Sequence, residues 1–514
     1  MFPGTHALTT PDKPAVIMAG SGRQLTYREL DDRSRRLAVA LADLGLVKGD
    51  VIAMLSDNDA ECFVIYWAAL RSGLYLTAVN FHLTAAEVAY IVDDCGAKVL
   101  IADGGLGELA EQVRAQVPGV EHAYNFGAVL DGFDSYAELL ESAGDRRPAD
   151  QPRGSDMLYS SGTTGRPKGI KPPLLPIQAD EPGDPITGLL GTAFGMTADD
   201  VYLSPAPIYH AAPLRWCGAV QAIGGTVVVL ERFKAESTLD AIQQYRATAV
   251  QVVPTMFVRM LQMSAEARAS YDVSSLRLAI HAAAPCPPDV KQAMIDWWGP
   301  ILVEYYSSTE ACGFTVINSA EWLTKRGSVG RSMLGPVHIC GDDGAELPTG
   351  EAGLVYFERD VRPFEYHNDP AKTKEAEHPD HGNWTTVGDI GYVDADGYLF
   401  LTDRKSFMII AGGVNIYPQE VEDALALHPA VFDVAVIGVP DPAMGQQVKA
   451  VVQLRDGVVP SAELAEQIIT HARTKVAAFK APRSVDFVDS LPRTPTGKLV
   501  KRTLVQQYAA APAG

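Results

Sequence analysis

The first 110 residues alternate between short apolar runs and amphipathic stretches. Residues 26–29 read Thr-Tyr-Arg-Glu, and Leu30, Leu37, Leu41 and Leu44 follow on one helical face. A capping box before such a stripe predicts a helix. Similar patterns predict strands at 51–55 and 98–102, and helices at 60–72 and after a second capping box at 84–87. This alternation is typical of an α/β fold, in which helices cover a parallel sheet.

The pattern changes toward the end of the chain. Apolar runs predict buried strands at 224–230, 249–253 and 276–280, and another enters the sequence 301–310. Alternating strands and turns around 327–353 indicate a small β-barrel-like subdomain. The later predicted elements are a helix at 418–427, a strand at 431–439, a helix at 461–476 and a strand at 485–488. They indicate a compact α+β domain of about a hundred residues.

Residues 159–170, YSSGTTGRPKGI, are too polar and too rich in glycine for a core strand or helix. Glycines let the backbone approach a ligand, while hydroxyls, backbone N–H groups, Arg166 and Lys168 supply donors and positive charge. Together these features describe a cradle for phosphate. The Walker pattern requires Ser or Thr directly after the lysine, and Gly169 stands there instead.

Length and charge narrow the classes of protein. A chain of 514 residues is too long for one hydrophobic core, so two or more domains are expected. The net charge of −20 argues against nucleic acid or an anionic membrane as partner. No apolar run approaches a membrane span, and the N-terminus shows no secretory signal. Six cysteines without a CxxC pair favour buried, reduced thiols in a cytoplasmic protein.

The phosphate cradle and four later motifs resemble those of the adenylate-forming (ANL) superfamily, which includes acyl-CoA synthetases, peptide-synthetase adenylation domains and luciferases. The later motifs are YYSSTE at 305–310, WTTVGD at 384–389, DRKSFMIIAGGVN at 403–415 and LPRTPTGK at 491–498. The resemblance covers residues 9 to 507. It implies a large N-terminal adenylation domain (1–402), a hinge (403–406) and a small mobile C-terminal domain (407–514).

The resemblance also implies how ATP would be bound. Tyr306 would stack on adenine, Asp389 and Arg404 would hold the ribose, and Glu310 would hold Mg²⁺. Lys498 would bridge the substrate carboxylate and the α-phosphate. The residues that the resemblance implies for nucleotide binding are Ser160, Ser161, Gly162, Thr163, Thr164, Gly165, Lys168, Ala283, Ala284, Tyr306, Ser307, Thr309, Asp389, Arg404 and Lys498. The catalytic candidates are Thr163, His210, Glu310 and Lys498.

His210 would stand between the acyl pocket and the CoA channel. The residues that follow it, AAPLRWCGA, contain no acid. Amino-acid-activating relatives carry an Asp here to pair with the substrate amine, so we expect a carboxylic acid without an α-amino group. Ser307 stands where relatives usually have Gly, which leaves the pocket depth open. The acyl-pocket candidates are His210, Trp216, Cys217, Ser307, Cys312 and Gly313.

In the C-terminal region, the resemblance implies that Gly412 and Gly413 line the pantetheine channel and that Phe479 and Arg483 contact the CoA adenine. A basic tail fits the CoA phosphates. Ser406 occupies the hinge position, where relatives usually have Asp or Lys. The proline-rich stretch 171–184 cannot be helical. It is either a lid over the nucleotide or a surface insertion, and we favour the insertion.

The predicted function is therefore an ATP-dependent carboxylic acid:CoA ligase with Mg²⁺ as cofactor. The carboxylate would attack the α-phosphate of ATP to give acyl-AMP and pyrophosphate; the small domain would then rotate, and CoA would take the acyl group. The acid is expected to be aromatic, medium-chain or alicyclic, including steroid-type. Two alternatives are an enzyme that loads a carrier protein and a catalytically silent nucleotide-binding regulator. Homodimers are common among relatives.

Overall fold

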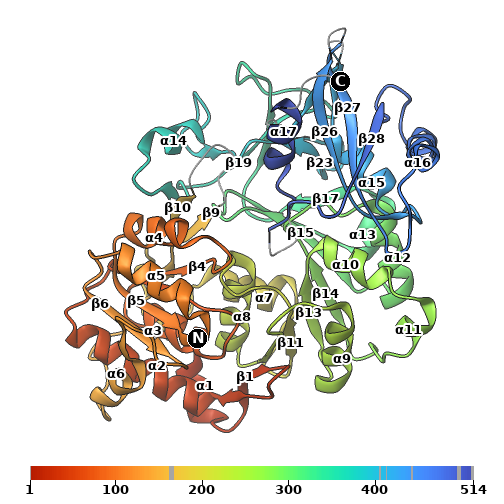
Figure 1. Cartoon of the computed structure of the whole chain (residues 1–514). Coiled ribbons are helices and arrows are strands. Elements are labelled where there is room, and N and C mark those ends of the chain that lie inside the picture. The colour runs from red at the N-terminus through yellow and green to blue at the C-terminus, as the bar shows by residue number, and fades with distance from the viewer. Residues whose placement is uncertain are drawn as a thin grey trace. The chain divides into compact units, whose positions relative to one another are not determined.

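The computed structural model describes residues 2–160, 167–404, 407–411, 414–441, 444–494 and 499–510, with the backbone alone for 403–404 and 509–510. The chain divides into two compact units (Figure 1). Unit 1 comprises residues 1–251, 271–278 and 363–373, and unit 2 comprises 252–270, 279–362 and 374–514. Within the described residues, no helix has the length and apolar character needed to cross a membrane.

Unit 1 contains a six-stranded sheet in which every pairing is parallel. Every residue of the central strand β3 (Val51–Leu55) is buried, as is typical of a parallel strand covered on both faces. Helices α2 (Tyr27–Asp43) and α3 (Glu61–Leu70) lie beside this sheet (Figure 1). The strand order is β7 (Asp134–Ser135), β6 (His122–Phe126), β5 (Ala97–Asp103), β3, β4 (Tyr75–Val79) and β8 (Ser155–Asp156).

Both predicted capping boxes are confirmed. The Thr26 hydroxyl accepts a hydrogen bond from the Glu29 backbone N–H, and the Glu29 carboxylate accepts one from the Thr26 N–H, at the start of α2. Thr84 and Glu87 make the same reciprocal pair before α4 (Ala85–Asp94). Each box satisfies two backbone donors that a helix N-terminus would otherwise leave without partners.

Unit 1 also contains a run of five paired strands and a separate three-stranded sheet. β11 (Val201–Ser204) pairs in parallel with β12 (Thr226–Val229) and with β13 (Ala249–Val252), and β12 pairs in parallel with β1 (Pro14–Met18), which continues antiparallel into β2 (Gln24–Thr26). The third sheet is antiparallel and orders β20 (Glu365–Tyr366), β10 (Lys168–Lys171) and β9 (Leu158–Ser160). Helices α7 (Pro185–Ala193) and α8 (Ala211–Ile223) pack on each other.

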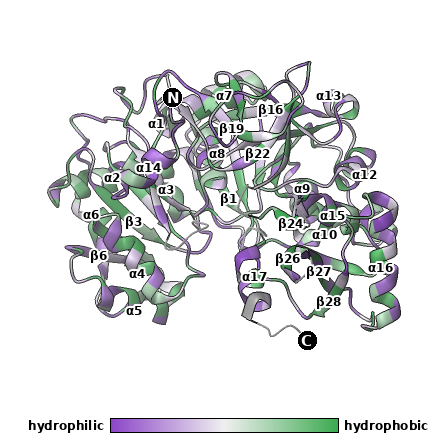
Figure 2. Ribbon diagram, turned by 90° about the horizontal axis from the view of Figure 1, so that it is seen from above, coloured by the Kyte–Doolittle hydropathy of each residue, from purple (hydrophilic) through white to green (hydrophobic). Residues whose placement is uncertain are grey.

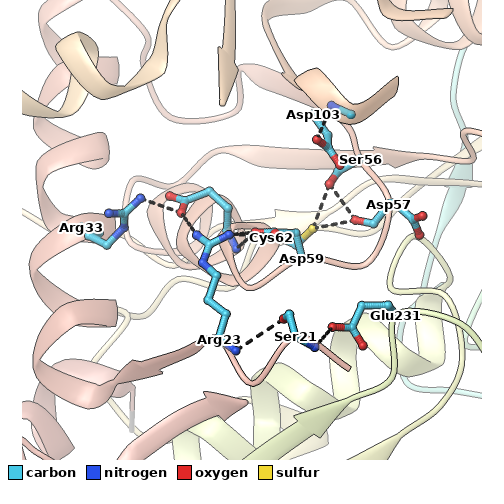
Figure 3. A network of polar contacts seen from close by, with 11 residues as sticks. Ser21, Arg23, Arg33, Ser56, Asp57, Asp59, Cys62, Asp103 and Glu231 are labelled. Atoms are coloured by element: carbon cyan, nitrogen blue, oxygen red, sulfur yellow. Dashed lines mark hydrogen bonds and ion pairs between the residues drawn. The ribbon is translucent and has the colours of Figure 1, made fainter. Parts of the chain in front are cut away.

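A polar network lies at the carboxyl ends of β3, β5 and β12 (Figure 3). Arg33 and Arg23 both contact the Glu61 carboxylate, at 2.6 and 3.3 Å, and Arg23 also contacts Asp59 at 2.9 Å. The Cys62 thiol donates to the Ser56 hydroxyl at 3.4 Å. Glu61 is buried and its Oε2 pairs with both arginines, while its Oε1 and the Arg33 Nε have no hydrogen-bond partner among the described residues.

β14 (Leu278–His281), which belongs to unit 2 from Ala279 on, pairs in parallel with β15 (Leu302–Ser307), and antiparallel strands follow. These are β16 (Phe314–Asn318), β17 (Ser328–Ser332), β23 (Leu399–Arg404), β22 (Asp389–Val393), β19 (Gly353–Glu358) and β18 (Val337–Cys340), in that spatial order. The region predicted to be β-barrel-like is this antiparallel part of the sheet.

The C-terminal residues form a five-stranded sheet with three helices. β26 (Val431–Asp441) and β27 (Gly445–Leu454) form its long antiparallel pair, and β28 (Ser484–Val488) joins β27 in parallel. The helix α16 (Ala462–Lys475) carries both polar and apolar residues (Figure 2), and its buried residues are Ile468, Ile469 and Ala472. The remaining elements are β24 (Ile409–Ala411), β25 (Val414–Ile416), α15 (Pro418–Leu425) and α17 (Lys501–Ala510).

The six cysteines are all free, and five of them are buried. Burial raises the pKa of the Cys62, Cys95, Cys217 and Cys312 thiols to about 12. These groups are therefore protonated and unreactive at neutral pH. The expectation of free thiols is confirmed, and that of burial is confirmed for all of them except the half-buried Cys286.

Candidate active site

The two strands that flank the glycine-rich segment form a hairpin. β9 and β10 pair antiparallel, with Ser160 opposite Lys168 and Tyr159 opposite Gly169. A hairpin with these partners holds the two ends of the intervening segment together. Five of the predicted phosphate-binding residues, Ser161, Gly162, Thr163, Thr164 and Gly165, lie outside the described residues. The structure thus shows the base of the proposed cradle, by which we mean the paired strands β9 and β10 on either side of it.

Lys168 contacts residues from a distant stretch of the chain. Its Nζ lies 3.5 Å from Asp369 Oδ2 and 5.5 Å from the centre of the Tyr366 ring. The Lys168 side chain is one-fifth exposed. Neither Asp369 nor Tyr366 was identified from the sequence, because nothing in the sequence pattern links residues about two hundred positions apart.

Two predicted nucleotide-binding residues meet directly in unit 2. The Tyr306 hydroxyl, from β15, donates to Asp389 Oδ2, from β22, at 2.6 Å. Asp389 is 7% exposed. Arg404 is the backbone partner of Asp389 across β22 and β23, although its side chain lies outside the described residues. Three positions remote in sequence therefore converge, as the resemblance to adenylate-forming enzymes implies.

The segment after β15 is folded tightly on itself. The Ser307 hydroxyl donates to the Gly313 carbonyl at 2.7 Å. A Cβ on Gly313 would lie 2.0 Å from the Phe357 ring, so only glycine fits there as the structure stands. Thr309 is half-buried, while Glu310 and Cys312 are buried within this turn. Among the described residues, no three His, Cys, Asp or Glu side chains group as metal ligands.

The predicted adenine-side residues follow β14. Ala283 has a φ of +76° and is exposed, and Ala284 is half-buried. A left-handed conformation is strained for a residue with a Cβ, and such strain is found where the surrounding structure fixes the backbone.

A buried charged pair lies beneath this segment, and the sequence reasoning missed it. Lys291 Nζ contacts Glu304 Oε2 at 2.6 Å, with the Lys291 side chain fully buried. The Lys291 ammonium also lies 4.9 Å from the centre of the Trp322 ring. Burial raises the pKa of Glu304 despite the Lys291 charge. Lys291 lies on the buried face of α12 (Pro288–Trp298), a helix that was not predicted from the sequence.

His281 completes this buried group. Its Nε2 lies 3.8 Å from Glu304 Oε2, its ring is fully buried, and neither ring nitrogen has a hydrogen-bond partner. Burial, together with the Lys291 charge, lowers the pKa of His281 well below its usual range. The imidazole is therefore neutral at physiological pH.

The predicted acyl-side residues lie on α8 and the loop before it. His210 occupies the position just before α8, and its ring centre lies 4.4 Å from that of Tyr209. The buried Asn58 side chain holds this loop, because it donates to Ala206 O and accepts from Ile208 N–H. Trp216 and Cys217 are both buried on α8, and Trp216 packs edge-on against Phe194 at 5.0 Å.

The proline-rich stretch contains no helix over 172–184, as predicted. It is tied to unit 1 at several points. Tyr75 donates to Pro172 O at 2.7 Å, Ala179 N donates to Gln151 O at 2.8 Å, and Arg153 contacts Asp184 at 3.3 Å. That the stretch is a surface insertion, and not a lid over the nucleotide, stays a prediction.

The predicted CoA-side residues Phe479 and Arg483 both have exposed side chains, and Phe479 is 58% exposed. The Arg483 Nη1 lies 3.9 Å from Asp441 Oδ2. Lys480 Nζ lies 5.9 Å from the Phe479 ring centre. An exposed aromatic ring beside a cation can stack on a purine. The other predicted residues of this region, Ser406, Gly412, Gly413 and Lys498, lie outside the described residues.

The chain is similar to known proteins along most of its length. The AMP-binding enzyme family matches residues 5–360, and the AMP-binding enzyme C-terminal domain matches 420–498. A long-chain-fatty-acid–CoA ligase of Mycobacterium tuberculosis is 33% identical over 98% of this chain and 97% of its own. A feruloyl-CoA synthase of an Amycolatopsis species is 35% identical over 99% and 98%.

Among solved structures, an o-succinylbenzoate CoA synthetase from Bacillus subtilis, in complex with its acyl-adenylate intermediate, superposes with a TM-score of 0.81. It is 25% identical and covers 100% of this chain and 98% of its own. With family models matching both ends of the chain and relatives aligned along nearly all of it, the chain belongs to the AMP-binding enzyme family.

Proposed function

We propose that this protein is an ATP-dependent carboxylic acid:CoA ligase that forms an acyl-adenylate and then a thioester. The observation that carries the proposal is the contact between Tyr306 and Asp389 at 2.6 Å, with Arg404 next to Asp389 across the strand pair. An aromatic ring beside a fixed carboxylate suits an adenosine, since the carboxylate can accept both ribose hydroxyls.

In the first half-reaction, the phosphate cradle and Lys168 bind the ATP polyphosphate while Asp389 and Tyr306 hold the nucleoside. Lys498 stabilises the charge that gathers as the substrate carboxylate approaches the α-phosphate. Glu310 is the residue that would hold Mg²⁺, because a carboxylate plus phosphate oxygens and water is the ligand set this ion prefers. When bound, the ion would neutralise phosphate charge.

In the second half-reaction, residues 407–514 would rotate about the hinge 403–406, which withdraws Lys498 and brings Gly412 and Gly413 to the acyl group. Phe479 and Arg483 would bind the CoA nucleotide. The exposure of both side chains supports this role, because a large polyanion needs an open, cationic surface.

The substrate is proposed to be a carboxylic acid without an α-amino group. Arg215, on α8, pairs with the Asp156 carboxylate at 2.7 Å, so this acid already has a cationic partner and is not free to bind a substrate amine. The buried, largely apolar side chains of Trp216 and Cys217 support an aromatic, medium-chain or alicyclic acid. The free cysteines support a reducing, cytoplasmic location.

The test is pyrophosphate release from ATP with a panel of benzoates, straight-chain acids and steroid acids, each with and without CoA, with the product followed by mass. Thioester formed from one class would establish the ligase and its substrate class. Pyrophosphate release with acyl-AMP but no thioester would move the acceptor to a carrier protein. ATP that is bound but never consumed would contradict the proposal and favour a regulator.

A further inference from the structure

The base of the phosphate cradle is fastened from its N-terminal side by α4. Tyr159, directly before the predicted cradle, donates its hydroxyl to Asp94 Oδ2 at 2.5 Å. Asp94 is the last residue of α4. Burial and the Asp94 hydrogen bond both raise the pKa of Tyr159, so its hydroxyl stays protonated and remains a donor. A short bond to a carboxylate restricts where the cradle can begin.

Asp94 also binds a segment from far along the chain. Asn368 Nδ2 donates to the Asp94 carbonyl at 3.3 Å. Asn368 has a φ of +54°, a left-handed conformation that asparagine tolerates better than most residues. One aspartate therefore joins Tyr159 to the segment that carries Asn368.

The same segment holds the C-terminal side of the cradle. β20 pairs with β10 through Ile170 and Tyr366, and His367 N donates to Gly169 O at 2.8 Å. The two carboxylate oxygens of Asp369 have different partners. Oδ1 accepts from Lys372 N–H at 2.9 Å, and Oδ2 faces Lys168 Nζ at 3.5 Å.

We propose that Asp94, Asn368 and Asp369 are positioning residues for ATP binding, which fix Tyr159 and Lys168 at the two ends of the phosphate cradle. This inference rests on the proposed function, since it takes ATP as the ligand. Asp369 holds the Lys168 ammonium in place beside the cradle, because the backbone bond to its other oxygen fixes the carboxylate.

The exposure of this ion pair distinguishes positioning from simple stabilisation. The Asp369 side chain is 40% exposed, and an exposed pair contributes little to folding. Removing the charge should therefore leave the melting temperature almost unchanged. A change in ATP affinity would report on where Lys168 is held.

The chain offers a closely matched control. Asp272, also in unit 1, has a 51% exposed side chain, lies 3.5 Å from Arg246, and accepts from Ser274 N–H at 2.9 Å through its other oxygen. Asp369→Asn and Asp272→Asn thus each remove a carboxylate that faces a cation through one oxygen and accepts a backbone N–H through the other. Only Asp369 lies at the cradle.

The experiment measures the Kd for ATP by calorimetry without acid, then KM for ATP, KM for the acid, kcat and Tm. We expect Asp369→Asn to raise Kd and KM for ATP by about two- to fivefold, with KM for the acid unchanged and Asp272→Asn equal to wild type. An ATP affinity equal to wild type, or tighter, in Asp369→Asn would overturn the role of this residue.

Two further variants test the Asp94 side. Tyr159→Phe removes one hydroxyl, and Asn368→Gly removes the side chain while favouring the observed φ. Both should weaken ATP binding at unchanged KM for the acid; equal loss for both substrates would mean a general folding defect and would overturn the inference. Wild-type protein that binds ATP but releases no pyrophosphate would count against the proposed function alone, because Kd still tests the positioning residues.

Discussion

Tyr306 and Asp389 are joined by a hydrogen bond of 2.6 Å between a hydroxyl and a 7% exposed carboxylate, across strands β15 and β22. The bond fixes the carboxylate in the orientation proposed for binding ribose. It also ties the ring proposed to contact adenine to the same point. The two roles are therefore coupled through one donor.

Tyr306→Phe keeps the ring and removes only this donor. We expect KM for ATP to rise about three- to tenfold, because Asp389 loses an orienting, charge-assisted hydrogen bond. Steady-state kinetics with ATP varied would measure it. Tyr398→Phe is the matched control, since Tyr398 donates to the Glu321 carboxylate at 3.2 Å in the same unit. Equal kinetics in the two variants would contradict the coupling.

Lys291→Met should destabilise the protein strongly. It leaves the Glu304 carboxylate buried without its cation, which costs about 3–5 kcal/mol in comparable cases. Urea denaturation would measure the free energy of unfolding. The double variant with Glu304→Leu should recover most of this loss, because both charges are then gone. A double variant as unstable as the single one would show that packing, and not charge, holds this site.

The stability should fall on mild acidification, partly through His281. Its folded pKa is lowered, so below the ordinary value near 6.5 the unfolded chain binds a proton that the folded state does not. The resulting loss of unfolding free energy is absent well above pH 6.5 and grows by about 1.4 kcal/mol for each pH unit below it. His281→Leu should unfold with a shallower dependence on pH between 6.5 and 5. An unchanged slope would mean that His281 is protonated in the folded state.

Lys498→Ala should separate the two half-reactions. We expect pyrophosphate release to fall by about a hundredfold or more, because a cation is lost where negative charge gathers. Thioester formation from supplied acyl-AMP should change far less. Lys48→Ala, at an exposed position of unit 1, serves as the control. An equal loss in both halves would contradict the rotation proposed for residues 407–514.

Local rules predicted much of the fold. The capping boxes at Thr26 and Thr84 fix helix starts through neighbours three residues away, and apolar runs such as 51–55 specify buried strands. The α/β class was predicted correctly from these patterns, and the family was predicted correctly from the resemblance of the five motifs. The predicted helix ends differ from the observed ones by one or two residues: α3 runs from Glu61 to Leu70, whereas the sequence predicted 60–72.

The sequence could not predict contacts that depend on tertiary pairing. Lys291 looks like any helical lysine until its helix is packed against β15, where Glu304 meets it. Asp369 follows a turn and carries no motif. Its relation to Lys168 exists only because β20 pairs with β10. Motif matching identified the groups proposed to touch ATP, whereas the groups that hold them in place required the structure.

The pairing of β20 with β10 has a consequence for the order in which the protein is made. The two strands are separated by about two hundred residues, so their contact closes a very long loop. A ribosome releases Lys168 long before it synthesises Tyr366. The nascent chain therefore carries an incomplete nucleotide site until most of the protein has emerged, and premature termination before residue 365 would leave β10 as an unpaired edge.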